Sequence, residues 1–158
     1  MTVEPVRKEL VVAASQVRAF RVFTEGMDRW WPRSHHIGSS PLARQVLEPR
    51  LGGRWYAISQ DGSECDLGTV LLWAPPDRLV LTWQLTADWK YDATFATEVE
   101  VTFAALGPKS TRVELWHRHL ERYAEAAPRV RQSIDSPEGW GGMLDRFGLV
   151  AAAEENGE

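Results

Sequence analysis

A run of short strand-like segments, each ended by a tight-turn sequence, constrains the fold of this chain more than any other feature. The separators carry residues that tight turns favour, as in Asp61-Gly62 and Gly107-Pro108-Lys109. Connections this short join neighbouring antiparallel strands. We therefore expect one antiparallel sheet in the middle of the chain. The segments cover residues 54–60, 64–73, 78–85, 98–106 and 110–117.

The residues before this run predict one more strand and two short helices. Charged and apolar side chains alternate from Val6 to Val12, as in a half-buried strand. Ser15 suits the N-cap of a helix that continues to about Glu25, and a second helical turn should stop at Pro32. Residues 33–45 are polar and contain serine and histidine, so we expect them to form a loop.

The last part of the chain has helical periodicity. Pro137 suits the first turn of a helix, and residues 118–136 should be partly helical. A helix over residues 138–153 would be ~24 Å long, which is comparable to the length of a strand. Because the apolar face of a sheet must be covered, we expect this helix to lie across it. The apolar residues that recur at helical spacing are Trp140, Leu144, Phe147 and Ala151.

Composition excludes several classes of protein. The 158 residues, 44% of them hydrophobic, suit a single domain over 1–158, with residues from about 5 to 153 ordered. A net charge of −4 without a basic block argues against a nucleic-acid partner. No apolar run approaches the ~20 residues of a membrane span, and the first residues lack a signal-peptide pattern, so we expect a cytoplasmic protein. The lone Cys65 excludes an intrachain disulfide and a Cys-based zinc cluster.

Tryptophan is unusually frequent, with eight residues in the chain. Each indole ring brings a large apolar surface and an N–H group that needs an acceptor when buried. A compact core of this size does not require so many rings. We therefore expect some of them to line a cavity or to face solvent. They are Trp30, Trp31, Trp55, Trp73, Trp83, Trp89, Trp116 and Trp140.

Alternation along each strand predicts which side chains face the interior. A register error of one residue would invert any of these assignments. The predicted inward rows are Leu79, Leu81, Trp83 and Leu85; Val99, Val101 and Phe103; Val113, Leu115 and His117; Leu67, Thr69, Leu71 and Trp73; and Trp55 with Ala57.

Several short motifs follow one another in an order that resembles a known superfamily. They include Trp30-Trp31-Pro32, Gly52-Gly53-Arg54-Trp55-Tyr56, Pro75-Pro76-Asp77-Arg78-Leu79 and the final Gly139-Trp140. On these residues the chain resembles the START-like, or helix-grip, superfamily, and within it the branch of the C-terminal domain of the activator of heat-shock protein 90 ATPase. The resemblance covers nearly the whole chain. It implies an α+β fold in which about six or seven antiparallel strands curve around the long C-terminal helix, with two short helices after the first strand.

The resemblance also implies a cavity between the concave sheet face and the last helix, suited to lipids, polyketides or other apolar molecules. Side chains of both elements should form its wall, and Trp116 is a further candidate although it alternates to the opposite face. The predicted wall residues are Trp55, Leu71, Trp83, Phe103, His117, Trp140, Leu144 and Phe147.

His117 is the polar residue that continues an apolar inward row. Its imidazole could orient a ligand carbonyl or act as a general base, which makes it the catalytic candidate. The alternative is a hydrogen-bonded histidine at the end of a strand. The adjacent His35 and His36 have no further ligands at metal-binding spacing, so we expect a loop at the lip of the cavity instead of a metal site.

Three functions remain open at this stage. The first is a module that binds a small hydrophobic molecule without a cofactor. The second, suggested by the resemblance alone, is a co-chaperone-like domain that binds a chaperone or another protein. The third is a cyclase or hydrolase that uses the same cavity, which is less favoured because no phosphate loop, nucleophile elbow or cofactor motif is present in the sequence. A homodimer is also left open.

Overall fold

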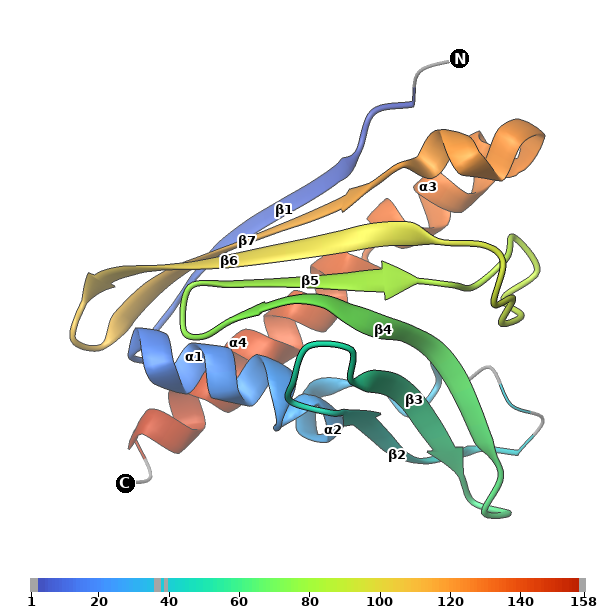
Figure 1. The fold of residues 1–158 in the computed structure, drawn as a ribbon. Coiled ribbons are helices and arrows are strands. Elements are labelled where there is room, and N and C mark those ends of the chain that lie inside the picture. Colours follow the sequence, from blue (N-terminus) through green and yellow to red (C-terminus); the bar gives the residue numbers. More distant parts are fainter. Residues whose placement is uncertain (1–2, 36–37, 39, 157–158) are drawn as a thin grey trace.

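The computed structural model describes residues 3–35, 38 and 40–156, and its centre is a seven-stranded antiparallel sheet (Figure 1). The strand order is β1-β7-β6-β5-β4-β3-β2, so that each strand from β2 to β7 pairs with its sequence neighbours and β1 pairs with β7. The predicted hairpins are confirmed. The strands are β1 (Val6–Val12), β2 (Leu42–Leu47), β3 (Arg54–Ser59), β4 (Glu64–Ala74), β5 (Arg78–Trp83), β6 (Thr97–Gly107) and β7 (Ser110–Arg118).

The long helix α4 crosses one face of the sheet, as the helix-grip expectation requires (Figure 1). Two short helices follow β1, and Ser15 caps the first of them by accepting a hydrogen bond from the Arg18 backbone N–H at 3.2 Å. No helix in the described part of the chain is long and apolar enough to cross a membrane. The helices are α1 (Gln16–Thr24), α2 (Met27–Trp30), the 3₁₀ segment η1 (Leu120–Ala126), α3 (Ala127–Asp135) and α4 (Trp140–Asn156).

Strand β2 corrects the expectation of a loop over residues 33–45. It pairs with β3 from Leu42 to Leu47, but its register shifts between Leu42 and Arg44. The shift breaks the alternation of apolar residues, and the inward position at its centre is occupied by the polar Gln45. Both effects remove the period of two that identifies a strand in a sequence.

A second bulge corrects two predicted inward positions in β4. The pairing of β4 with β5 shifts between Val70 and Leu72, so one residue there has no partner. Leu71 is that residue, and it is 46% exposed instead of facing the interior. Thr69 pairs with Arg54 across β3 and β4, so the two side chains lie on the same face of the sheet. The Arg54 guanidinium forms an ion pair with Asp66 on the outer face, and Thr69 therefore also lies on the outer face.

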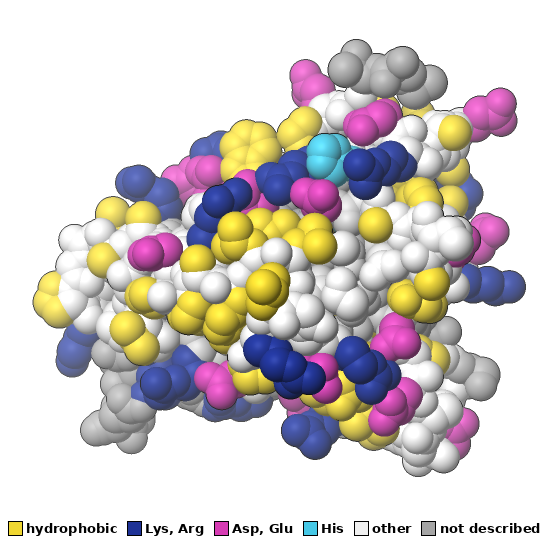
Figure 2. Space-filling view, viewed as in Figure 1, with side chains coloured by type: hydrophobic (Ala, Val, Ile, Leu, Met, Phe, Trp, Pro, Cys, Tyr) yellow, Lys and Arg dark blue, Asp and Glu magenta, His cyan; other side chains and the backbone are white. Residues whose placement is uncertain are grey.

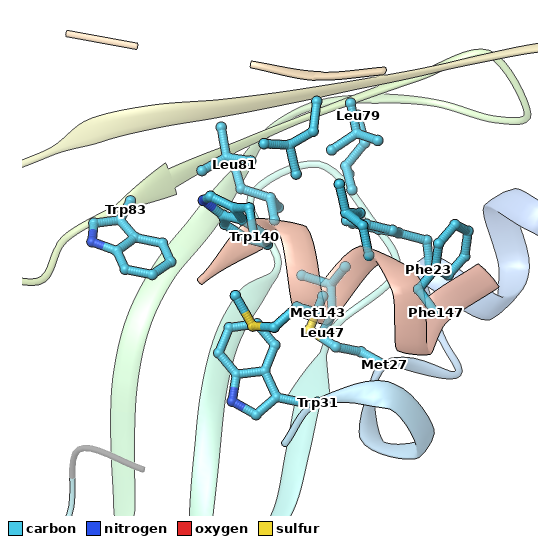
Figure 3. Packing of buried hydrophobic residues seen from close by; sticks show 14 of the residues in the cluster. Phe23, Met27, Trp31, Leu47, Leu79, Leu81, Trp83, Trp140, Met143 and Phe147 are labelled. Carbon is cyan, nitrogen blue, oxygen red and sulfur yellow. The ribbon is translucent and has the colours of Figure 1, made fainter. Parts of the chain in front are cut away.

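The other predicted inward rows of β5, β6 and β7 are buried. At one end of the interior, aromatic rings from α1, α4 and β6 pack against one another. The ring centroids of Phe23 and Phe147 are 5.3 Å apart, and those of Phe20 and Phe103 are 5.2 Å apart. Figure 3 shows Phe23 and Phe147 at this end of the cluster and Trp83 and Trp31 at the other end.

The outer face of the sheet carries paired charges, which Figure 2 shows as neighbouring basic and acidic side chains. Arg118 binds Glu98 at 2.9 Å and Glu100 at 2.6 Å. Trp116 lies on this face, where the Arg7 guanidinium stacks over its ring. The alternation that placed Trp116 away from the interior is therefore correct, and Trp116 takes no part in an interior site.

Candidate functional site

A cavity of about 240 Å³ lies between the start of α4 and the β2–β5 part of the sheet. Its volume is somewhat below the ~300–1,000 Å³ of typical ligand pockets, so it suits a compact molecule better than a long lipid chain. The residues that line it are Trp31, Ser34, His35, Gln45, Ala57, Leu67, Trp83, Leu85, Trp89, Ser133, Ile134, Ser136, Glu138, Gly139, Trp140 and Met143.

Four indole rings make up much of the cavity wall. Trp83 on β5 and Trp140 at the start of α4 have ring centroids 5.7 Å apart, and Trp31 lies 6.3 Å from Trp140 (Figure 3). Trp89 lies 6.4 Å from Trp83 in the connection between β5 and β6 and is 38% exposed. The first three rings therefore form an inner wall, and Trp89 lies where the wall meets solvent.

The predicted site residues divide into three groups. Trp83 and Trp140 line the cavity. Leu71 is exposed on the outside of the molecule, because the β4 bulge turns it away. The third group is buried but does not reach the cavity wall, since its side chains pack against other core residues; it consists of Trp55, Phe103, His117, Leu144 and Phe147.

His117 is fully buried behind Trp140, and both of its ring nitrogens are occupied. The indole N–H of Trp140 donates to His117 Nδ1 at 3.1 Å. An indole nitrogen can only donate, so Nδ1 must be unprotonated and the proton must reside on Nε2. His117 Nε2 then donates to the Thr97 hydroxyl oxygen at 2.8 Å. Burial lowers the pKa of His117 to about 3, and the ring is neutral.

This arrangement favours a positioning role for His117 over the role of a general base. A base needs a free lone pair within reach of the substrate, and the lone pair on Nδ1 already accepts from Trp140. What the histidine does is fix the orientation of the Trp140 ring in the cavity wall. The same hydrogen bond ties the first residue of α4 to β7.

Gln45 is the polar residue in the wall with unmet hydrogen-bonding groups. It lies on β2 opposite Ala57, and the residue is only 3% exposed. Neither its amide oxygen nor its amide nitrogen has a hydrogen-bond partner among the described residues. The indole N–H groups of Trp55 and Trp83 also lack an acceptor within hydrogen-bond geometry, although that of Trp83 approaches the Tyr123 hydroxyl. Most buried polar groups in proteins are paired, so this set is unusual.

The lip of the cavity includes the loop after α2, as expected for His35. The indole N–H of Trp31 donates to the His35 carbonyl at 3.0 Å. The His35 ring in turn contacts the Glu138 carbonyl just before α4. His36 lies outside the described residues. Within the described ranges, no group of three or more His, Cys, Asp or Glu residues could hold a metal ion.

A residue of η1 anchors the connection that carries Trp89. The Tyr123 hydroxyl donates to the Leu85 carbonyl at 2.6 Å, and burial raises the pKa of Tyr123 to about 12. Leu85 pairs with Tyr91 across the loop that carries Trp89. Tyr123 is therefore a neutral hydrogen-bond donor that fixes this loop next to the cavity.

Sequence reasoning did not identify much of the observed wall. Gln45 was missed because β2 was not recognised as a strand. Ile134 was missed because residues 118–136 were predicted only as partly helical, and Met143 lies outside the predicted apolar row of the last helix. Trp89 was predicted only as one of eight tryptophans, and its place beside Trp83 depends on the fold of the connection between β5 and β6.

The antiparallel sheet curved around a long C-terminal helix, with two short helices after the first strand, defines a helix-grip α+β protein. Within this class, the chain belongs to the Activator of Hsp90 ATPase homolog 1-like protein family, whose model matches residues 13–151. The matched range includes every residue of the cavity wall. Comparison with curated proteins gives no match.

Two solved structures are similar in sequence as well as in fold. The chain is 39% identical to Txn09, an anthrahydroquino-γ-pyrone synthase complexed with SUM, covering 94% of this chain and 97% of that one at a TM-score of 0.67. It is 32% identical to CalC, a self-sacrificing resistance protein from Micromonospora echinospora, covering 98% of both chains at a TM-score of 0.71. Protein NE0264 from Nitrosomonas europaea, at 15% identity over 96% of both chains and a TM-score of 0.69, shares the fold.

Proposed function

We propose that this protein binds a small hydrophobic molecule in the cavity between the sheet and the start of α4. The observation that carries the proposal is the composition of the wall, where four indole rings surround a space that no side chain fills. Aromatic walls with a few placed polar groups are typical of small-molecule sites. The similarity to the anthrahydroquino-γ-pyrone synthase Txn09 supports an aromatic ligand more than a long-chain lipid.

A cavity-filling variant tests this proposal. Ala57 lines the cavity and is buried, so Ala57→Leu should place three extra carbons in the empty space with little strain. We expect the affinity for a compact aromatic probe such as naphthalene to fall at least about tenfold, because the probe and the new side chain compete for the same volume. Quenching or enhancement of tryptophan fluorescence reports binding, since four indoles line the site.

The matched control is Ala104→Leu, which adds the same atoms at an exposed position of β6. It should bind the probe like the unaltered protein. Equal affinities for Ala57→Leu and Ala104→Leu would show that the cavity is not the binding site. A second experiment is native mass spectrometry of protein purified from cells, which identifies a natural ligand. We expect this ligand to be lost in Ala57→Leu but kept in Ala104→Leu.

A second candidate function is catalysis of a cyclisation in the same cavity, and the similarity to a synthase favours it. In the arrangement described above, His117 has no free nitrogen to act as the base. Catalysis would therefore rest on holding a reactive substrate between the indole rings in a productive shape. Conversion of a bound polyketide-type substrate, measured by chromatography, distinguishes an enzyme from a carrier. The co-chaperone hypothesis remains a prediction that only the family name supports.

A further inference from the structure

The side-chain amide of Gln45 combines three properties that a core residue rarely has. Gln45 is only 3% exposed, and it lines the cavity. Neither of its polar side-chain atoms has a hydrogen-bond partner among the described residues. A buried amide without a partner destabilises a fold, whereas a leucine or methionine at the same place would not. The position therefore carries a polar group at a cost to stability, which a ligand could offset.

The surroundings of Gln45 leave room for such a ligand. Its partner across the β2–β3 pair is Ala57, which is small and also lines the cavity. The apolar rings of Trp83 and Trp140 provide flat surfaces in the same wall. A ligand between these groups would meet aromatic faces and one carboxamide.

A carboxamide presents an acceptor oxygen and a donor N–H₂ group side by side. A ligand group that pairs with both must place a donor opposite the amide oxygen and an acceptor opposite the N–H₂ group. A lactam, a primary amide and a hydroxyl next to a carbonyl each have a donor and an acceptor side by side. An alkyl chain or a plain aromatic hydrocarbon satisfies neither. Sites built around a buried hydrogen-bonding group reject analogues that lack the matching group much more strongly than apolar pockets reject a change of size.

We propose that Gln45 is the specificity-determining residue of the cavity and selects flat aromatic ligands whose edge carries a hydrogen-bond donor next to a carbonyl acceptor. This inference rests on the proposed function, because it assumes that the cavity binds a small molecule. It adds the class of ligand and the residue that recognises it.

A matched series of two-ring probes tests the inference. Isoquinolin-1(2H)-one has an N–H beside a carbonyl, its N-methyl derivative keeps only the carbonyl, and naphthalene has neither group. We expect isoquinolin-1(2H)-one to bind at least about tenfold tighter than the other two, since each of them leaves part of the Gln45 amide unpaired. Calorimetry or fluorescence titration measures the three affinities.

The variant Gln45→Leu should remove this discrimination. We expect the three probes to bind Gln45→Leu within about threefold of one another, with naphthalene bound at least as tightly as by the unaltered protein. The control Gln60→Leu makes the same change at an exposed position and should keep the tenfold preference. Thermal unfolding checks that Gln45→Leu folds, and its stability should be unchanged or higher because an unpaired amide is removed.

Each outcome separates this inference from the proposed function. If all three probes bind the unaltered protein equally, or if Gln45→Leu keeps the preference, Gln45 does not select the ligand, although the cavity still binds apolar molecules. If none of the probes binds, both the inference and the proposed function are wrong.

Discussion

Single side chains set the properties of the cavity wall, and the pair His117–Trp140 is the clearest example. The histidine accepts the indole N–H and stays neutral because it is buried. The sequence predicted that His117 faces inward, since it continues the row of Val113 and Leu115. The hydrogen bond to Trp140 could not be predicted, because it depends on where α4 begins relative to β7.

The neutral state of His117 makes the stability of the protein depend on pH in a defined direction. The pKa of His117 is about 3 in the folded protein and 6.5 in the unfolded chain. Between these values the unfolded chain binds the additional proton, so the free energy of unfolding falls as the pH falls below 6.5, by up to about 1.4 kcal/mol per pH unit. Chemical denaturation at pH 7, 6.5 and 6 measures this slope above the range in which carboxylates titrate.

The variant His117→Gln cannot take up this proton, and it should show a shallower slope over the same range. His119→Asn, which removes a histidine whose side chain is 37% exposed, is the matched substitution with which the slope of His117→Gln is compared. A slope that is the same in His117→Gln and in the unaltered protein would show that His117 is not held neutral by the fold.

At the scale of elements, the first turn of helix α4 contains two glycines whose surroundings differ. A Cβ added at Gly142 would lie 2.0 Å from the Pro137 carbonyl oxygen, but one added at Gly141 would have its nearest neighbour at 3.8 Å. Gly141→Ala should therefore raise the free energy of unfolding by up to about 1 kcal/mol through helix propensity. Gly142→Ala should lower it by about 1–3 kcal/mol, because the turn before the helix must shift.

Urea denaturation of the two variants compares the same substitution at adjacent positions. The expected result is a higher midpoint for Gly141→Ala and a lower one for Gly142→Ala. If both variants were stabilised, the turn that leads into α4 would not approach Gly142 as closely as described. Helix propensity by itself assigns the same cost to a glycine at either position, so the difference between the two comes from their surroundings in the fold.

The elements that the sequence predicted well are those with unbroken periodicity. Strands β1, β3, β5, β6 and β7 and helix α1 end within two residues of their predicted bounds. Prediction was wrong where a bulge interrupts the period of two, as at Leu71 in β4 and ahead of Gln45 in β2. Because Gln45 belongs to such an interrupted strand, the interruption hid a central residue of the candidate site.

The whole molecule is filled at one end and hollow at the other. Phe103 contacts Phe20 and Phe23 at the filled end, and Trp83 and Trp140 line the hollow end. The sequence predicted the enclosing fold but could not divide the wall residues between these ends. That division depends on how many rings α1 and α4 insert between the sheet and the helix.

Phe103→Leu should separate stability from binding. Because Phe103 is buried at the filled end, its truncation should lower the free energy of unfolding by about 1–3 kcal/mol. The affinity for naphthalene should stay within about twofold of the unaltered protein, since the cavity wall is untouched. Denaturation and fluorescence titration give the two quantities, and a large loss of affinity in Phe103→Leu would mean that the two ends do not act independently.

The hydrogen bond from Trp140 to His117 also limits how this part of the cavity wall can respond to a ligand and to pH. With its N–H committed, Trp140 offers an incoming molecule only the face and edge of its ring. With its own proton fixed on Nε2 and a pKa of about 3, His117 does not change charge across the acidity range of living cells. Mild acidification therefore does not charge this histidine, and its hydrogen bonds to Trp140 and Thr97 are kept at ordinary pH.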